Sequence, residues 1–306
     1  MLKFTNIPDL LKLIDEQVFI KHLEKIIWKG KSPVSPFDPT SKVYKYANGR
    51  YRCKNTGKYF NVKTGTIFEN SKLPLWKWFY ALHLYSNHKK GVSSHYLARE
   101  IKTTQTSAWF VLHRLRFVSD IPLFKGILKG IVEIDETFVG GKNKNRHKDK
   151  KVPNSQGRSY IDKVPVLGMI ERGSGNLIAQ VVPNTRQETL EPIIRENVEK
   201  GAVVHTDKHH GYNDLYKWYK HGAFNKKKEP QTNRKVSTNC IESAWAPFKR
   251  SVYGIYHKVS SKHLPKYVRE MVLRHNTRNW DDEERFDLLL ASAVGKRLTY
   301  ESLIHR

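Results

Sequence analysis

The apolar residues of the first 70 positions change their spacing, which separates a helical segment from a small β unit. In residues 8–28 they recur at three- or four-residue steps, the pattern of an amphipathic helix. Residues 30–40 carry three prolines and are expected to be irregular. Short alternating stretches follow around Asn48-Gly49, a dipeptide that favours a hairpin turn. We therefore predict an N-terminal helical segment over residues 1–34 and a β unit over residues 35–70.

Residues 71–120 have a helical pattern throughout. An apolar helix is predicted from Leu75, and two shorter helices are predicted to end at Ile101 and to begin near Gln105. Two short helices joined by a tight turn, the second rich in polar and basic side chains, are typical of a helix-turn-helix, although an ordinary helical hairpin has the same pattern. The candidate DNA contacts are Gln105 and Ser107, which suit base edges, and Arg114 and Arg116, which suit phosphates.

The larger region, residues 130–280, alternates between strand and helix patterns. Strands are predicted over residues 131–139, 164–170, 177–182 and 202–206. Helices are predicted over residues 185–200 and from Thr238 or Asn239 onward, and basic loops over residues 142–151 and 225–235. This order predicts an α/β fold with a mixed sheet flanked by helices. Residues 281–306 are predicted to form a C-terminal helical tail.

The charge of the chain points to a polyanionic partner. Lys and Arg number 55 against 29 Asp and Glu, a net charge of +26. Because binding releases counterions from phosphates, this charge favours nucleic acid as a partner, although a solubilising surface is the alternative. Two cysteines exclude a disulfide-rich secreted scaffold and a four-cysteine zinc site. No apolar run reaches the roughly 18 residues of a membrane span, and no signal peptide is evident, so we expect a soluble protein of a reducing compartment with no membrane partner.

Three acidic residues are placed where their carboxylates could act together. Asp135 lies inside an apolar strand, Asp207 follows the strand over residues 202–206, and Glu242 lies on the predicted helix one turn after Asn239. An isolated buried carboxylate is unfavourable. Three converging carboxylates are stabilised by divalent cations, and such hard oxygen ligands suit Mg²⁺. Two such ions about 4 Å apart activate a water or hydroxyl and stabilise the leaving oxygen of a phosphodiester. The alternative for each acid alone is a surface or salt-bridged residue.

Other side chains near these acids have less specific patterns. His205, His209 and His210 flank Asp207 but lack the further ligands of a zinc site, and they either contact a phosphate or lie on the surface. Cys240 has no evident partner for thiol catalysis. Trp245 and Tyr253 are expected in the core, with stacking on an unpaired terminal base as the alternative. The chain has no P-loop or dinucleotide fingerprint, so no nucleotide energy source is implied.

The motifs around the three acids resemble a known family. The stretches VEIDETFVGGK, VVHTDKHHGY, STNCIESAW and FKRSVYGIYHKVSSKHL are similar to insertion-sequence transposases of the IS1595 type, which carry an ISXO2-like transposase domain. The similarity extends over about residues 35–278. It implies an RNase H-like catalytic domain over residues 130–280, with Asp135, Asp207 and Glu242 as the catalytic acids and metal ligands of a DDE site. It also implies two Mg²⁺ or Mn²⁺ ions and a contact between Lys249 and the DNA end. Arg250 and Asn239 are further candidate DNA contacts.

Two features depart from the family pattern. The family usually opens with a zinc ribbon of two Cys-x2-Cys pairs, but the four positions are here Pro36, Pro39, Cys53 and Thr56. One thiolate cannot hold structural Zn²⁺, so we predict a β unit without zinc. The aromatic residues expected to hold it together are Tyr44, Tyr46, Tyr51, Tyr59 and Phe60. The second departure is Pro247, which removes a helical hydrogen bond between Glu242 and Lys249 and is expected to kink the helix.

Together these features predict a DNA transposase of an insertion sequence. The helices in residues 74–116 would bind the terminal inverted repeats, and the domain over residues 130–280 would cleave the element ends and join the 3′-hydroxyl to target DNA. The resemblance also implies a homo-oligomer in the complex with double-stranded DNA and a location in the bacterial cytoplasm with the nucleoid. Two alternatives stay open. One is a transposase-derived DNA-binding protein without activity, against which the intact acids argue, and the other is an RNase H-like nuclease, against which the helix-turn-helix argues.

Overall fold

The computed structural model describes residues 15–140, 147–153, 163–224 and 236–304. The chain divides into two compact units, one formed by Met1–Ser119 with Trp280–Arg306 and the other by Asp120–Asn279. The segment predicted as a C-terminal tail therefore contributes to the same unit as the N-terminal residues. No helix within the described ranges is long and apolar enough to cross a membrane.

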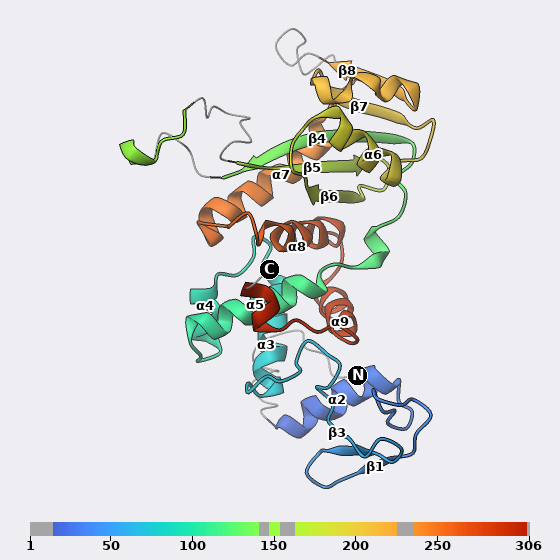
Figure 1. The fold of residues 1–306 in the computed structure, drawn as a ribbon, viewed down its shortest axis with the longest axis vertical. Coiled ribbons are helices and arrows are strands. Elements are labelled where there is room, and N and C mark those ends of the chain that lie inside the picture. Colours follow the sequence, from blue (N-terminus) through green and yellow to red (C-terminus); the bar gives the residue numbers. More distant parts are fainter. Residues whose placement is uncertain (1–14, 141–146, 154–162, 225–235, 305–306) are drawn as a thin grey trace. The chain divides into compact units, whose positions relative to one another are not determined.

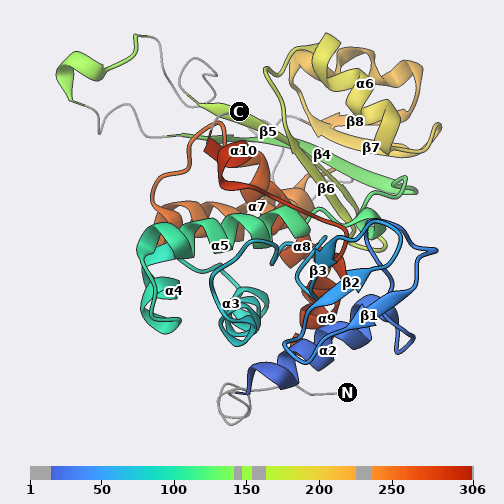
Figure 2. The same cartoon turned by 60° about the horizontal axis from the view of Figure 1, so that its bottom comes forward.

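The first unit contains helix α2 (Glu16–Trp28), which packs beside a small sheet (Figure 2). The helix begins after Asp15, whose side chain accepts a hydrogen bond from the Gln17 amide at 2.9 Å. The earlier part of the predicted helix lies outside the described residues. Strands β1 (Val43–Lys45), β2 (Tyr51–Cys53) and β3 (Tyr59–Phe60) form an antiparallel sheet in that order. Gly49 has φ +74° in the β1–β2 hairpin, a left-handed conformation that glycine adopts without strain, and this confirms the predicted Asn-Gly turn.

Further helices of the first unit are α3 (Leu75–Asn87), α4 (Ser94–Glu100), α5 (Gln105–Val118), α9 (Asp282–Ser292) and α10 (Tyr300–Ile304). Helices α4 and α5 confirm the predicted pair of short helices. Each begins after a hydroxyl residue that caps it, because the Ser93 side chain accepts from the Tyr96 amide and the Thr104 side chain from the Ser107 amide. The turn between them passes through Lys102, which has φ +48°.

The second unit is built on a five-stranded sheet with the order β6-β5-β4-β7-β8 (Figure 1). Its strands are β4 (Ile131–Val139), β5 (Val164–Glu171), β6 (Leu177–Val181), β7 (Val203–Asp207) and β8 (Lys220–Phe224). Strand β4 is antiparallel to β5 and parallel to β7, and β7 is parallel to β8, so the sheet is mixed, as predicted. The sequence pattern missed β8, which lacks polar–apolar alternation but pairs with β7 along all five of its residues.

Helices cover both faces of this sheet. Helix α6 (Gln187–Asn197) and the 3-10 helix η4 (His210–Lys217) pack on the face that carries Val132 and Ile134. Helices α7 (Asn239–Ser251) and α8 (Leu264–Asn276) pack on the other face, which carries Val139, Val166 and Ile170 (Figure 1). Short 3-10 turns lie at Pro122–Phe124 and Lys148–Lys150, and a π-helical turn, Val252–Tyr256, follows α7. Successive β4 residues alternate between the faces, so Glu133 and Asp135 point to the side that α7 covers.

Candidate functional site

Asp135 and Asp207 lie side by side on neighbouring parallel strands. Glu133 of β4 pairs with His205 of β7, and the same register continued by two residues brings Asp135 opposite Asp207. Strand β7 ends at Asp207, so the two aspartates mark the carboxyl end of that strand. Both are buried, each with 6% of its surface exposed. The carboxyl ends of strands are where open α/β sheets carry their sites.

The carboxylates at this end of the sheet raise the pKa of a buried tyrosine, Tyr212. Burial raises the pKa of Tyr212 well above its ordinary value, and the carboxylates of Glu136, Asp135 and Asp207 raise it further. All three carboxylates therefore act on one hydroxyl, and negative charge is concentrated around this end of β4 and β7. Glu136 points to the opposite face from Asp135, where its Oε1 lies 4.0 Å from Nδ1 of His209.

Helix α7 is fixed over the aspartate face by Glu133. This residue is completely buried, and its Oε2 accepts hydrogen bonds from the amides of Cys240 at 2.7 Å and Ile241 at 3.2 Å. Its Oε1 accepts from Nε of Arg172 at 2.6 Å, and the same guanidinium donates to the Ser237 hydroxyl at 2.6 Å. Glu133 thus caps α7 from the adjacent strand, where the amides at a helix N-terminus favour negative charge.

A glycine lets α7 approach the strand beside Asp135. Gly168 of β5 pairs directly with Asp135 of β4, and the indole ring of Trp245 lies against it. A Cβ atom at Gly168 would stand only 2.5 Å from Cζ2 of Trp245 and 2.9 Å from Cδ1 of Ile241. Trp245 is 2% exposed, so its predicted place in the core is confirmed. Sequence reasoning missed the roles of Gly168, Glu133 and Arg172, since each depends on where α7 lies.

Glu242 lies on α7 two residues after Cys240 and is half-buried. The Thr238 hydroxyl donates to its Oε1 at 2.9 Å. Helix α7 continues through Pro247 to Ser251, so Glu242 and Lys249 belong to one helix and, seven residues apart, share one side of it. The other candidate DNA contacts on α7, Asn239 and Arg250, are exposed, as is Lys249.

The three acids do not form a complete metal-ligand set in the described part of the chain. Asp135 and Asp207 lie on neighbouring strands, each two residues beyond the paired Glu133 and His205, and Glu242 is carried by the helix on the same face of the sheet. Among the residues that the structure describes, no group of three or more His, Cys, Asp or Glu side chains is arranged to hold a metal ion.

The flanking residues fall into different environments. His205 is 6% exposed, and burial lowers its pKa, with the nearby Arg172 lowering it further. The His209 ring caps η4, accepting from the Gly211 amide at 3.1 Å, whereas His210 is exposed. Tyr253 is 49% exposed in the π-helical turn, so the prediction that it lies in the core is wrong.

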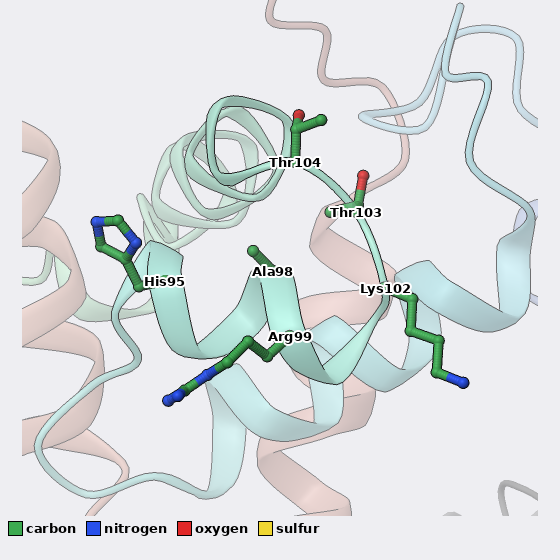
Figure 3. Close-up of a pocket in the computed structure, with 6 residues that line it drawn as sticks. All are labelled: His95, Ala98, Arg99, Lys102, Thr103 and Thr104. Atoms are coloured by element: carbon green, nitrogen blue, oxygen red, sulfur yellow. The ribbon is translucent and has the colours of Figure 1, made fainter.

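In the first unit, the turn between α4 and α5 borders a hollow of about 700 Å³ (Figure 3). It is lined by His95, Ala98, Arg99, Lys102, Thr103 and Thr104. Gln105 follows at the start of α5 and is exposed, although its Nε2 donates to the Ser94 hydroxyl at 2.7 Å. Ser107, two residues further along the helix, is half-buried. Basic and hydroxyl side chains therefore surround the N-terminus of α5.

Two arginines proposed as phosphate contacts belong to the interior. Arg114 and Arg116 are only 6% and 1% exposed. The Arg114 guanidinium donates to the carbonyls of Leu298 at 3.0 Å and Ile67 at 2.7 Å and lies 4.5 Å from the ring centroid of Phe110. These contacts leave it no surface for a phosphate. The prediction that Arg114 and Arg116 contact DNA is therefore wrong.

The β unit is held together by fewer aromatic residues than predicted. Tyr51 and Phe60 pack with Trp28 of α2 in a small core. Tyr44, Tyr46 and Tyr59 are exposed and lie outside this core, although the rings of Tyr46 and Tyr59 contact each other. Cys53 is buried among the hydroxyls of Ser35, Ser41 and Thr56. Burial raises the pKa of this thiol, but the hydrogen bonds from those hydroxyls outweigh that effect and lower it to about 6.

Comparison with known proteins relates this chain to mobile elements. Residues 127–276 match the family model of the ISXO2-like transposase domain. A protein of Halobacterium salinarum, described as an uncharacterized protein in transposable element ISH50, is 27% identical over 258 residues. This similarity covers 80% of the present chain and 84% of that protein.

Proposed function

Residues 127–276 belong to the ISXO2-like transposase domain family, and on this basis we propose that the chain is the DNA transposase of an insertion sequence, with an RNase H-like catalytic domain. The observation that carries the proposal is that Asp135 and Asp207 lie on the neighbouring parallel strands β4 and β7, two residues beyond the paired Glu133 and His205, on the face covered by the helix that bears Glu242. In this proposal, the transposase binds the terminal inverted repeats, cleaves the element ends and joins the freed 3′-hydroxyl to target DNA. Each joining step breaks one phosphodiester bond as it forms another, so no nucleotide energy is needed.

The donor chemistry of the site fits a hard divalent cation. The two adjacent side chains are carboxylates, and the negative charge that raises the pKa of Tyr212 favours a cation there. Asp135, Asp207 and Glu242 would hold Mg²⁺ or Mn²⁺, as two ions. When bound, such ions activate the attacking oxygen and stabilise the leaving oxygen of a phosphodiester. In this proposal, the Glu133 cap holds the N-terminal end of α7, the helix that bears Glu242, against the sheet.

The DNA contacts in this proposal lie on two surfaces. Lys249, Arg250 and Asn239 lie exposed on α7 and would contact the element end near the acids. Gln105 and Ser107, at the start of α5, would read base edges of the terminal repeat, with Arg99 and Lys102 beside them for phosphates. Cleavage at both element ends favours a homo-oligomer in the DNA complex.

The test replaces each acid by its amide. Asp135→Asn, Asp207→Asn and Glu242→Gln should each abolish end cleavage in Mg²⁺ while DNA binding stays largely intact, because a ligand is lost without a phosphate contact. Matched controls are Asp214→Asn and Glu199→Gln, which change acids paired with Lys217 and Lys129 in the same unit. A variant that keeps near wild-type cleavage refutes the role of that acid.

The same assay separates the two other functions. A protein that binds element ends but cleaves nothing is a transposase-derived DNA-binding protein. A protein that cleaves without joining the 3′-hydroxyl to target DNA is a nuclease.

A further inference from the structure

The β1–β2–β3 sheet of the first unit has two unlike faces. Tyr51 and Phe60 pair across β2 and β3 and point to the side where Trp28 of α2 packs. Tyr44 pairs with Arg52, and Arg52 pairs with Tyr59, so these three side chains share the other side. Their neighbours two positions away in sequence extend this side. We call the set Lys42, Tyr44, Tyr46, Arg52, Lys54 and Tyr59 the outer face.

The outer face combines exposed rings with cations. Tyr44 and Tyr46 are each 40% exposed and Tyr59 is 56% exposed, and the rings of Tyr46 and Tyr59 lie 5.8 Å apart. Nζ of Lys42 lies 5.6 Å from the Tyr44 ring centroid, and the Arg52 guanidinium lies 5.9 Å from that of Tyr59. None of the six residues is acidic. Exposed aromatic rings grouped in this way mark a binding surface more often than a solvated one.

The charge of the surrounding segment suits an anion. Residues 31–70 hold eight Lys and Arg against two Asp and Glu. Both acids have partners within the unit. Asp38 accepts from Thr40 and Asn55, and Glu69 accepts from the Gly65 amide and pairs with Arg297 at 3.2 Å. The positive potential of the outer face is therefore left for an external ligand.

We propose that the outer face binds an unpaired DNA strand, with bases stacked on Tyr44, Tyr46 and Tyr59 and phosphates held by Lys42, Arg52 and Lys54. Base faces are covered in a duplex but free in a single strand, so exposed rings favour the single strand, and cations beside them follow its backbone. This site is separate from the helix-turn-helix and from α7, and it does not depend on the catalytic role of the acids. The alternative is that the tyrosines only stabilise the sheet by cross-strand packing.

The experiment measures how full-length protein binds a fluorescent oligothymidylate and a matched duplex. Tyr59→Leu removes a ring but keeps apolar volume, and it should weaken single-strand binding by about tenfold with little change for the duplex. Tyr59→Phe should bind like wild type because stacking needs the ring and not the hydroxyl. Tyr216→Leu, which removes an exposed tyrosine of the second unit, is the matched control and should have no effect.

Photocrosslinking tests directly where the unpaired strand lies on the chain. An oligothymidylate carrying 5-iodouracil should crosslink wild-type protein within residues 42–59, and Asp135→Asn should crosslink equally, which separates this site from catalysis. Crosslinks confined to other segments overturn the proposal. So does an equal loss of single-strand and duplex binding in folded Tyr59→Leu, since that outcome shows that the ring does not distinguish an unpaired strand from a duplex. Unchanged oligothymidylate binding in Tyr59→Leu also overturns the proposal. That result is expected if the outer face binds a segment of protein and not DNA.

Discussion

Replacing Gly168 by alanine tests how closely α7 must approach the strand beside Asp135. The added Cβ would lie 2.5 Å and 2.6 Å from the outer-ring atoms Cζ2 and Cη2 of Trp245, where ordinary contacts begin at 3.4 Å. Trp245 is 2% exposed, and a side chain in a close-packed interior has little room to change its rotamer. We therefore expect the helix to carry the ring outward.

The size of the effect follows from that overlap. Relieving the contact requires a shift of about 1 Å, and such overpacking costs about 1–3 kcal/mol of folding free energy. Glu242 precedes Trp245 by one helical turn and moves with it. Misplacement of a catalytic group by about 1 Å lowers the rate about 100-fold, so we expect Gly168→Ala to cleave element ends about 100-fold more slowly while the protein still folds.

The assay compares end cleavage with urea unfolding in a double-mutant cycle. Trp245→Phe removes the outer ring that clashes, so Gly168→Ala combined with Trp245→Phe should cleave better than Gly168→Ala alone. Gly126→Ala, where an added Cβ meets nothing within 4 Å, is the control. If Gly168→Ala cleaves at the wild-type rate, or if the two substitutions are simply additive, the approach of α7 at Gly168 does not govern the site.

Three further predictions concern the cap, the helix-turn-helix and zinc. Glu133→Gln should lower the free energy of unfolding by about 3–5 kcal/mol, since it leaves Arg172 without its buried anion. It should also speed hydrogen exchange at the Cys240 and Ile241 amides, and unchanged exchange contradicts the role of Glu133 as a helix cap. Gln105→Ala should lower the preference for element ends over random DNA by about 1–3 kcal/mol, whereas Lys102→Ala should weaken both alike in a salt series. An unchanged ratio for Gln105→Ala, with loss of preference on deletion of residues 142–151, refutes the helix-turn-helix assignment. Purified protein should hold substoichiometric zinc, and about one zinc per chain would contradict the loss of the ribbon ligands.

The sequence predicted those elements that are determined by residues close together in the chain. The alternation in residues 131–139, the Asn48-Gly49 turn and the start of a helix near Gln105 depend on residues within one strand or one turn, and the structure has each of them. Strand β8 has no such signal, because only pairing with β7 makes it a strand.

The helical spacing of α5 predicts that Arg114 and Arg116 are buried. In α5, Val111 and Val118 are buried, and Arg114 lies three residues after the first and four before the second, on the same stripe. Arg116 follows the buried Leu112 by four residues. Helical spacing therefore places both arginines inward, whereas their polarity alone suggested an outward position.

The geometry of the candidate site depends on the register of β4 and not on its acids alone. A shift of one residue along β4 would turn Glu133 and Asp135 toward α6 and η4, and Val132 and Ile134 toward α7. Because that exchange would expose the core under α6 to two carboxylates, the apolar residues hold the register. The same register sets Gly168 opposite Asp135 and brings Glu133 to the N-terminus of α7, 107 residues later in the chain. The alternating pattern in residues 131–139 is therefore visible in the sequence, while the distance between Asp135 and the helix carrying Glu242 is decided by contacts that no local pattern contains.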